Sequence, residues 1–160
     1  MKRLTLVRHA QAEDKFLGQR DWDRPLTKRG ILDANEMAQR LKTKRLKPEA
    51  ILSSPSLRTQ QTSDIFAAHL SGSQIETLEE LYLATCSQLL KTLQSQNKFN
   101  HLLIVGHNPG LTELADLISD QYRIDGMPTA SIVTMKLNIE SWQDLTPTMG
   151  INVEFDYPQK

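Results

Sequence analysis

The sequence has little cysteine, no excess of one charge and no long apolar run, and each shortage excludes a class of protein. Its only cysteine is Cys86, which rules out a disulfide within the chain and a zinc site built from several cysteines. Nineteen basic residues balance nineteen acidic ones, so a broad basic surface that binds nucleic acid is not expected. The longest apolar stretches, such as residues 102–105, are far shorter than the roughly 20 residues that span a bilayer. We therefore expect no nucleic-acid partner, no membrane partner and a reducing, cytoplasmic location.

The rest of the composition is that of an ordinary globular protein. Of the 160 residues, 39% are hydrophobic and 24% are charged, which is unlike the composition of disordered or fibrous chains. The sequence contains no internal repeat, no low-complexity segment and no linker. A chain of this length forms one domain, so we predict that residues 1–160 are a single domain.

Short apolar runs alternate along the chain with segments of helical periodicity. The apolar runs predict strands at residues 4–7, 50–52, 75–78, 101–105, 131–137 and 151–155. The periodic segments predict helices from Thr27 as the N-cap to about residue 42, and at residues 55–70, 88–96 and 111–118. The pattern predicts an α/β fold, a three-layer sandwich in which helices flank a mostly parallel central sheet.

Two finer expectations follow from the same patterns. On the first helix, Ile31, Ala34, Ala38 and Leu41 recur at a spacing that places them on one face. The last two strands alternate apolar and polar residues, which predicts one half-exposed face on each.

Arginine and histidine residues follow three of the predicted strands. Arg8 and His9 follow the first strand, Arg58 lies one turn into the helix after the second, and His107 follows the strand at residues 101–105. Ligands of open α/β sheets bind beyond the carboxyl ends of the strands, so these four side chains should converge there. Guanidinium groups and helix N-termini match phosphate oxygens, and histidine can be a nucleophile or a cationic donor near neutral pH. The sequence therefore predicts a phosphate site.

An ordered set of motifs carries a resemblance to a known family. The motifs are Leu-Val-Arg-His-Ala at residues 6–10, Asp-Arg-Pro-Leu-Thr at 23–27, Ser-Ser-Pro at 53–55 with Arg58 and Thr62, and Val-Gly-His-Asn-Pro-Gly at 105–110. Together they resemble the histidine phosphatase superfamily, whose members share the phosphoglycerate mutase-like fold. In its short length and its Asp-Arg-Pro-Leu motif, the chain is most similar to the small branch that includes the bacterial phosphohistidine phosphatases.

The resemblance implies a role for each residue of the cluster. His9 would be the nucleophile of a phosphohistidine enzyme intermediate, Arg8 and Arg58 would bind the phosphoryl oxygens, and His107 would donate to the phosphoryl group. It implies no metal and no other cofactor. Relatives often place an acidic residue after the third strand, so Glu80 is the candidate general acid, with a surface carboxylate as the equal alternative.

The expected substrate is phosphohistidine on a protein such as a histidine phosphotransfer domain, because so short a chain has little room for the insertions that enclose small sugars. The alternatives are a phosphatase of a small phosphate monoester and a binding module that holds phosphate without turnover. Outside the cluster, we interpret His69, His101 and Cys86 as structural. The basic residues Arg24, Lys28 and Arg29 form either a solvated patch or a surface that orients a phosphorylated partner. Residues 10–25 and 120–130 should form the walls of the site, but they have no pattern that predicts a role.

Overall fold

A single mixed β-sheet forms the centre of the computed structural model, which describes residues 1–120 and 123–159. The strand order is β3-β2-β4-β1-β5-β6. The six strands are β1 (Lys2–Arg8), β2 (Ala50–Ser53), β3 (Gln74–Thr77), β4 (His101–Gly106), β5 (Ile132–Leu137) and β6 (Gly150–Asp156). The pairs β2–β3, β2–β4 and β1–β4 are parallel, whereas β1–β5 and β5–β6 are antiparallel.

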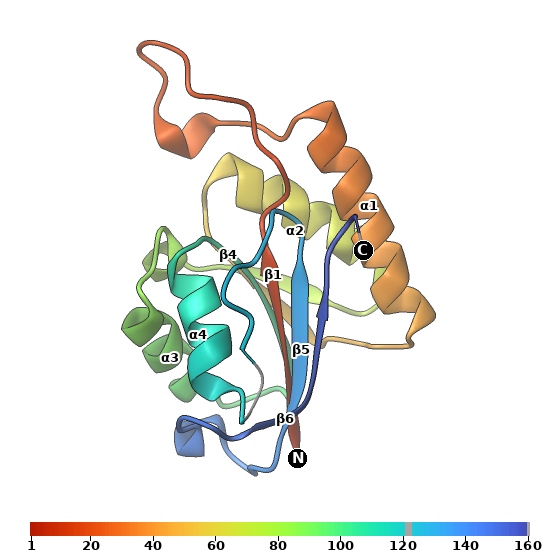
Figure 1. The fold of residues 1–160 in the computed structure, drawn as a ribbon, viewed down its shortest axis with the longest axis vertical. Coiled ribbons are helices and arrows are strands. Elements are labelled where there is room, and N and C mark those ends of the chain that lie inside the picture. The colour runs from red at the N-terminus through yellow and green to blue at the C-terminus, as the bar shows by residue number, and fades with distance from the viewer. Residues whose placement is uncertain (121–122, 160) are drawn as a thin grey trace.

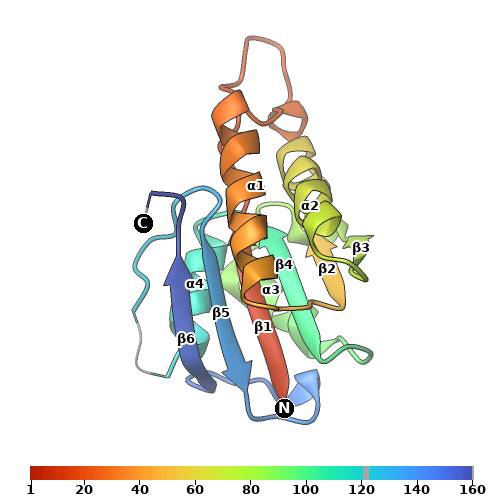
Figure 2. The same ribbon diagram turned by 90° about the vertical axis from the view of Figure 1, so that its right-hand side faces the viewer.

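Helices cover both faces of the sheet, which confirms the predicted α/β sandwich. Figures 1 and 2 show α1 (Lys28–Thr43) and α2 (Leu57–His69) on one face and α3 (Cys86–Gln94) and α4 (Gly110–Ile118) on the other. Three short 3-10 helices lie in the connections: η1 (Asp21–Asp23), η2 (Glu79–Leu81) and η3 (Trp142–Asp144). No helix in the described ranges is both long and apolar enough to cross a membrane.

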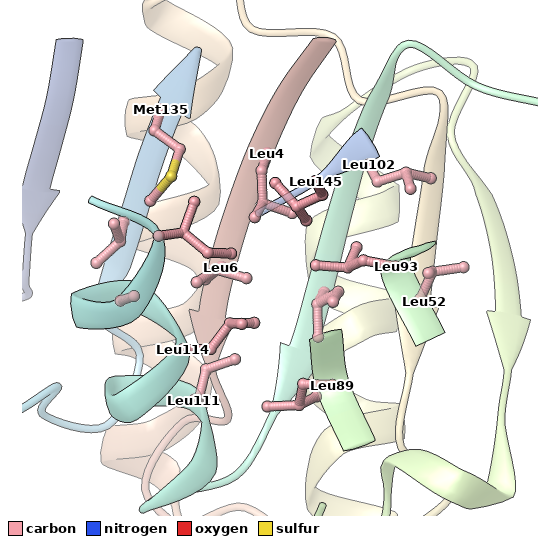
Figure 3. Packing of buried hydrophobic residues seen from close by; sticks show 14 of the residues in the cluster. Leu4, Leu6, Leu52, Leu89, Leu93, Leu102, Leu111, Leu114, Met135 and Leu145 are labelled. Atoms are coloured by element: carbon pink, nitrogen blue, oxygen red, sulfur yellow. The ribbon is translucent and has the colours of Figure 1, made fainter. Parts of the chain in front are cut away.

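The core has two halves because successive side chains of a strand point to opposite faces of the sheet. On β1, Leu4 and Leu6 pack with the leucines of α3 and α4 (Figure 3), whereas Val7 packs with α1 and α2. Every residue of β4 is buried, as expected for an inner parallel strand with helices on both sides. The two buried halves hold the central strands rigidly, so the residues at the strand ends have fixed positions.

The register of the parallel strands brings the predicted site together. Val7 on β1 is opposite Val105 on β4, and Ser53 on β2 is opposite the same residue from the other side. The three strands therefore end at the same level. The residues that follow them start from neighbouring points on one edge of the sheet.

The predicted start of the second helix was wrong. The second helix begins at Leu57 with Ser56 as the N-cap residue, not at Pro55. The reason is that Ser54, which directly follows β2, is still bound to β4 and the site: its backbone N–H donates to Val105 O, and its hydroxyl contacts His107. On α1, Ile31 is exposed, because the inward stripe runs through the buried residues Gly30, Ala34, Met37, Ala38 and Leu41.

The expectation of a half-exposed face is also wrong for β5. Five of its six residues are buried and only Lys136 is partly exposed. The strand lies between β1 and β6, and it contributes to the cores on both faces. The edge strand β6 does alternate as predicted, because helices do not cover it to the same extent (Figure 2).

Gly30 allows the first turn of α1 to approach the start of the long loop at residues 10–25. A Cβ atom at this position would collide with the backbone oxygen of Gln11, the same oxygen that accepts from Thr27 N. We expect Gly30→Ala to lower the free energy of unfolding by about 1–3 kcal/mol, measured by urea denaturation. Gly126→Ala is the matched control because a Cβ there has open space. Equal losses in the two variants would contradict the close approach.

Candidate active site

Two histidine rings face each other at the edge where the parallel strands end. His9 follows β1 and His107 follows β4, and their ring centroids are 5.4 Å apart. The backbone fixes this pair, because His9 N donates to Gly106 O. Ala10 N donates to the Thr62 hydroxyl on α2. Both rings are thus anchored within the rigid part of the fold.

His9 is held as a neutral imidazole with one free ring nitrogen. Its Nδ1 lies 2.8 Å from the carbonyl oxygen of Ala10. A carbonyl only accepts hydrogen bonds, so Nδ1 carries the proton and Nε2 keeps its lone pair. Burial lowers the pKa of His9 to about 4; the bond to Ala10 opposes this shift, and the charges of Arg58 and Arg8 add to it. At neutral pH the unprotonated Nε2 can therefore act as a nucleophile.

His107 is buried between a hydroxyl and a guanidinium. Its Nε2 lies 2.7 Å from Ser54 Oγ, and its Nδ1 lies 3.4 Å from Arg58 Nη2. Burial lowers its pKa to about 3; repulsion between the two rings when both are protonated and the charge of Arg58 lower it further, while Asp21 opposes them. A bound phosphoryl group would add negative charge beside this ring, which favours the protonated form that donates a hydrogen bond.

Two arginines lie near His9, because the charges of Arg58 and Arg8 both lower its pKa, and each carries an unpaired donor. Arg58 is 2% exposed, and Arg8 donates from Nη1 to Met127 O. Among the described residues, the only buried side-chain nitrogens without a hydrogen-bond partner are Nε of Arg8 and Nε of Arg58. A buried N–H without a partner is costly. The pair therefore indicates a place for an anionic ligand with several acceptor oxygens, such as phosphate.

The long loop at residues 10–25 contributes a carboxylate that the sequence did not predict. Asp21 lies in η1, and its backbone oxygen accepts from Arg58 Nη1 at 2.8 Å. Its Oδ2 accepts from Arg58 Nη2 at 2.9 Å and from the Tyr82 hydroxyl at 2.6 Å. Its Oδ1 accepts from Arg24 Nη1 at 3.1 Å. Partial burial opposes ionisation, but hydrogen bonds from Tyr82, Arg58 and Arg24 hold the pKa of Asp21 well below its usual range.

Aromatic residues complete the wall on this side. The Tyr82 ring meets the His107 ring edge-on, with centroids 5.5 Å apart, and Trp22 packs against Tyr82 at 4.8 Å. Trp22 thus packs the loop down beside the site. Tyr82 follows η2, two residues after Glu80 in the chain.

The structure brings together Arg8, His9, Arg58 and His107, but not Glu80. The Glu80 side chain is exposed on η2, and it makes no hydrogen bond or ion pair with any described residue. Its role as a general acid stays a prediction.

Other candidate residues lie in different surroundings. Arg24 is partly buried, bridging Asp21 and the backbone of Glu13, so it belongs to the rim of the site. Arg29 pairs with Asp33 on α1. His101 begins β4, and its Nε2 lies 2.8 Å from Oγ1 of Thr5 on the neighbouring strand β1. His69 ends α2 and contacts Asn35.

The wall predicted at residues 120–130 is partly described. Residues 121 and 122 lie outside the described ranges. Met127 O accepts hydrogen bonds from Arg8 and from Asn108 Nδ2, so this segment does border the phosphate donors. In the described part of the chain, no three His, Cys, Asp or Glu side chains are grouped as a metal site requires.

The three buried histidines predict that acid weakens the fold. Burial is the largest cause that lowers the pKa of His9, His101 and His107 from 6.5 to between about 3 and about 4. Between those values and 6.5 the unfolded chain binds protons that the folded chain does not. Stability is therefore complete above pH 6.5 and falls as the pH drops. Each histidine contributes up to about 1.4 kcal/mol per pH unit. Urea denaturation at pH 7, 6 and 5 measures this slope, and a constant free energy of unfolding would contradict it.

Comparison with known proteins identifies the family of the chain. Residues 4–84 match the histidine phosphatase superfamily (branch 1), so the chain belongs to that family, as the sequence motifs predicted. An uncharacterized protein of Picosynechococcus sp. is 35% identical over 119 residues, 72% of each chain. An uncharacterized chloroplastic protein of Arabidopsis thaliana is 33% identical over 129 residues, 74% of this chain, and this match spans 59% of the plant protein.

A solved structure shows the same fold. It is the structure of a protein assigned as the phosphohistidine phosphatase SixA from Agrobacterium tumefaciens. The two chains share 29% sequence identity and superpose with a TM-score of 0.79 over 85% of this chain and 92% of the other. The family and this neighbour support a phosphatase.

Proposed function

We propose that this protein is a metal-independent phosphatase that forms a phosphohistidine intermediate on His9, and that its substrate is phosphohistidine on another protein. The observation that carries the catalytic part is a neutral His9 within the electrostatic reach of Arg58 and Arg8, each of which has one buried N–H without a hydrogen-bond partner. Arginine donors can bind the phosphoryl oxygens while the free Nε2 attacks phosphorus. Phosphoryl transfer requires this positioning and positive charge more than other chemistry.

The reaction then has two steps. The Nε2 lone pair of His9 forms a bond to phosphorus, and the bond to the leaving group breaks with its electron pair on that group. Water next attacks phosphorus, the electron pair of the N–P bond returns to Nε2, and the phosphate leaves as dihydrogen phosphate with both protons of the water. Protonated His107 donates to the phosphoryl oxygens, whose charge favours that protonated form.

Two features of the surface support a protein substrate. Leu57 and Leu83 are exposed large apolar residues. Leu57 directly precedes Arg58 in the chain, and Leu83 directly follows Tyr82. Phe16 and Leu17 are exposed in the loop that carries Asp21. Exposed apolar side chains on the segments that carry a polar site favour a surface that binds another protein. Cytoplasmic location is part of the same proposal, because the only cysteine, Cys86, is a free thiol.

Site-specific dephosphorylation tests the substrate. A histidine phosphotransfer domain phosphorylated on its histidine is expected to lose phosphate with a kcat/KM at least tenfold above that of p-nitrophenyl phosphate. The comparison runs in excess EDTA, which should leave both rates unchanged. A rate on the phosphoprotein no higher than that on the aryl ester would refute the proposed substrate.

A small phosphate monoester is the second candidate, and Glu80 distinguishes it. An alkyl ester has a poor leaving group and needs a general acid, whereas p-nitrophenolate and imidazole do not. If Glu80→Gln abolishes cleavage of an alkyl ester such as glycerol phosphate while retaining p-nitrophenyl phosphate hydrolysis, the result favours a small phosphate monoester as the substrate. We expect the exposed Glu80 to have little effect on either.

A further inference from the structure

Asp21 places a fixed negative charge at the mouth of a site that otherwise consists of positive and neutral groups. Its side chain is 37% exposed, and η1 lies beyond the strand ends beside the first turn of α2 (Figure 1). Arg58 Nη2 touches both Asp21 and His107. The carboxylate is therefore two hydrogen bonds from the ring that faces His9, and on the solvent side of Arg58.

This carboxylate has acceptor capacity left. Its Oδ2 accepts from Arg58 and Tyr82, and Oδ1 accepts from Arg24. A carboxylate offers about four acceptor positions, so one position on Oδ1 is open to a further donor. An ionised acceptor at the exit of a phosphate pocket repels anionic groups and attracts groups that carry an N–H.

We propose that Asp21 selects the leaving group: it accepts a hydrogen bond from the ring N–H of a phosphorylated imidazole and disfavours leaving groups that depart as anions. The inference rests on the proposed phosphatase activity and assigns a specificity-determining residue to it. His9 lies at the buried floor of the site. In the proposed pose, the leaving group departs from the buried His9 toward solvent and passes η1, where the Asp21 side chain is 37% exposed.

The proton balance of the reaction explains why this contact accelerates it. In a protonated phosphoimidazole, one ring nitrogen bears the phosphoryl group and the other bears a proton. When the P–N bond breaks, its electron pair stays on the ring, and the ring leaves as neutral imidazole with no external acid. Asp21 favours the protonated ring through its hydrogen bond and charge. The reaction then needs no general acid, which fits a site whose candidate acid, Glu80, is exposed and unpaired within the described residues.

A ratio of two rates separates this role from a structural one. The probes are phosphoimidazole, which leaves as imidazole, and p-nitrophenyl phosphate, which leaves as an anion. In Asp21→Asn, kcat/KM for phosphoimidazole divided by that for p-nitrophenyl phosphate is expected to fall about 10- to 100-fold. The pH above which phosphoimidazole cleavage declines should also fall, because the ring proton is held less tightly.

Asp23→Asn is the matched control. Asp23 lies on the same 3-10 helix and pairs with Arg20, so its variant should keep the wild-type ratio. Tyr82→Phe removes one donor to Asp21 but leaves the negative charge, and it should retain most of the selectivity.

The failures of the two proposals can be told apart. If Asp21→Asn lowers both rates equally, Asp21 only positions Arg58, and the selectivity proposal is overturned while the phosphatase remains. If the wild-type protein cleaves neither probe, or if His9→Ala still cleaves both, the proposed function itself fails. A higher ratio in Asp21→Asn than in the wild type would also refute the selectivity role.

Discussion

Replacing His9 with alanine is expected to slow the hydrolysis of p-nitrophenyl phosphate at least about a thousandfold in excess EDTA. The substrate needs no general acid, so its cleavage depends only on the phosphate donors and the nucleophile. Arg8, Arg58 and His107 remain in this variant, and phosphate should still bind. The expected loss is therefore mainly in kcat, which steady-state kinetics separates from KM.

His69→Ala is the control for this variant. His69 ends α2 and hydrogen-bonds the exposed side chain of Asn35, so its loss should leave the rate unchanged. Equal activity of His9→Ala and wild type would mean that another residue is the nucleophile.

Arg58→Lys is expected to lower kcat/KM for the same substrate by about a hundredfold or more, although the positive charge is kept. Arg58 uses Nη1 and Nη2 to hold Asp21 and to reach His107, and its Nε is left for the ligand. A lysine ammonium is a single point charge and cannot serve these three directions together. The loss should appear in KM as well as in kcat, because both phosphate binding and the placement of His107 depend on the guanidinium.

Arg20→Lys is a matched change on the same loop. Arg20 is largely exposed and pairs with Asp23, so this variant should behave as wild type. If Arg58→Lys retained full activity, the planar geometry of the guanidinium would not be required, and the unpaired Nε would not be a phosphate donor.

The part of the site that could be predicted from the sequence comes from regular structure. His9 and His107 each follow an apolar run. Parallel strands in register end at one level, so strand prediction alone places the two rings together. Arg58 was found for the same reason, because a helix that follows a strand starts at that edge. The predicted layers and the family follow from these same motifs.

The residues that were missed lie where no period guides a prediction. Asp21 is in a loop of about sixteen residues without a repeating pattern, and only tertiary contacts with Arg58 and Tyr82 bring it to the site. Glu80, two positions earlier, is the candidate acid because relatives often place an acidic residue after the third strand, whereas no motif in the sequence indicates Tyr82. The 3-10 turn of η2 leaves Glu80 exposed and places Tyr82 against His107.

The error in the predicted start of the second helix also comes from tertiary contacts. The pair Ser54 and Pro55 has the sequence signature of a helix start, yet Ser54 is used by His107 and Val105 instead. The demands of the site thus override a local signal, which is typical of functional positions.

The position of the phosphoryl group during turnover tests the central claim most directly. The protein is mixed with p-nitrophenyl phosphate and quenched in alkali, where phosphohistidine survives, and peptide mass spectrometry then locates the phosphate. We predict phosphate on the peptide that contains His9, at the imidazole, and none in the His9→Ala protein. Rapid turnover by the wild type with no phosphate on His9, and with His9→Ala equally active, would contradict a histidine nucleophile.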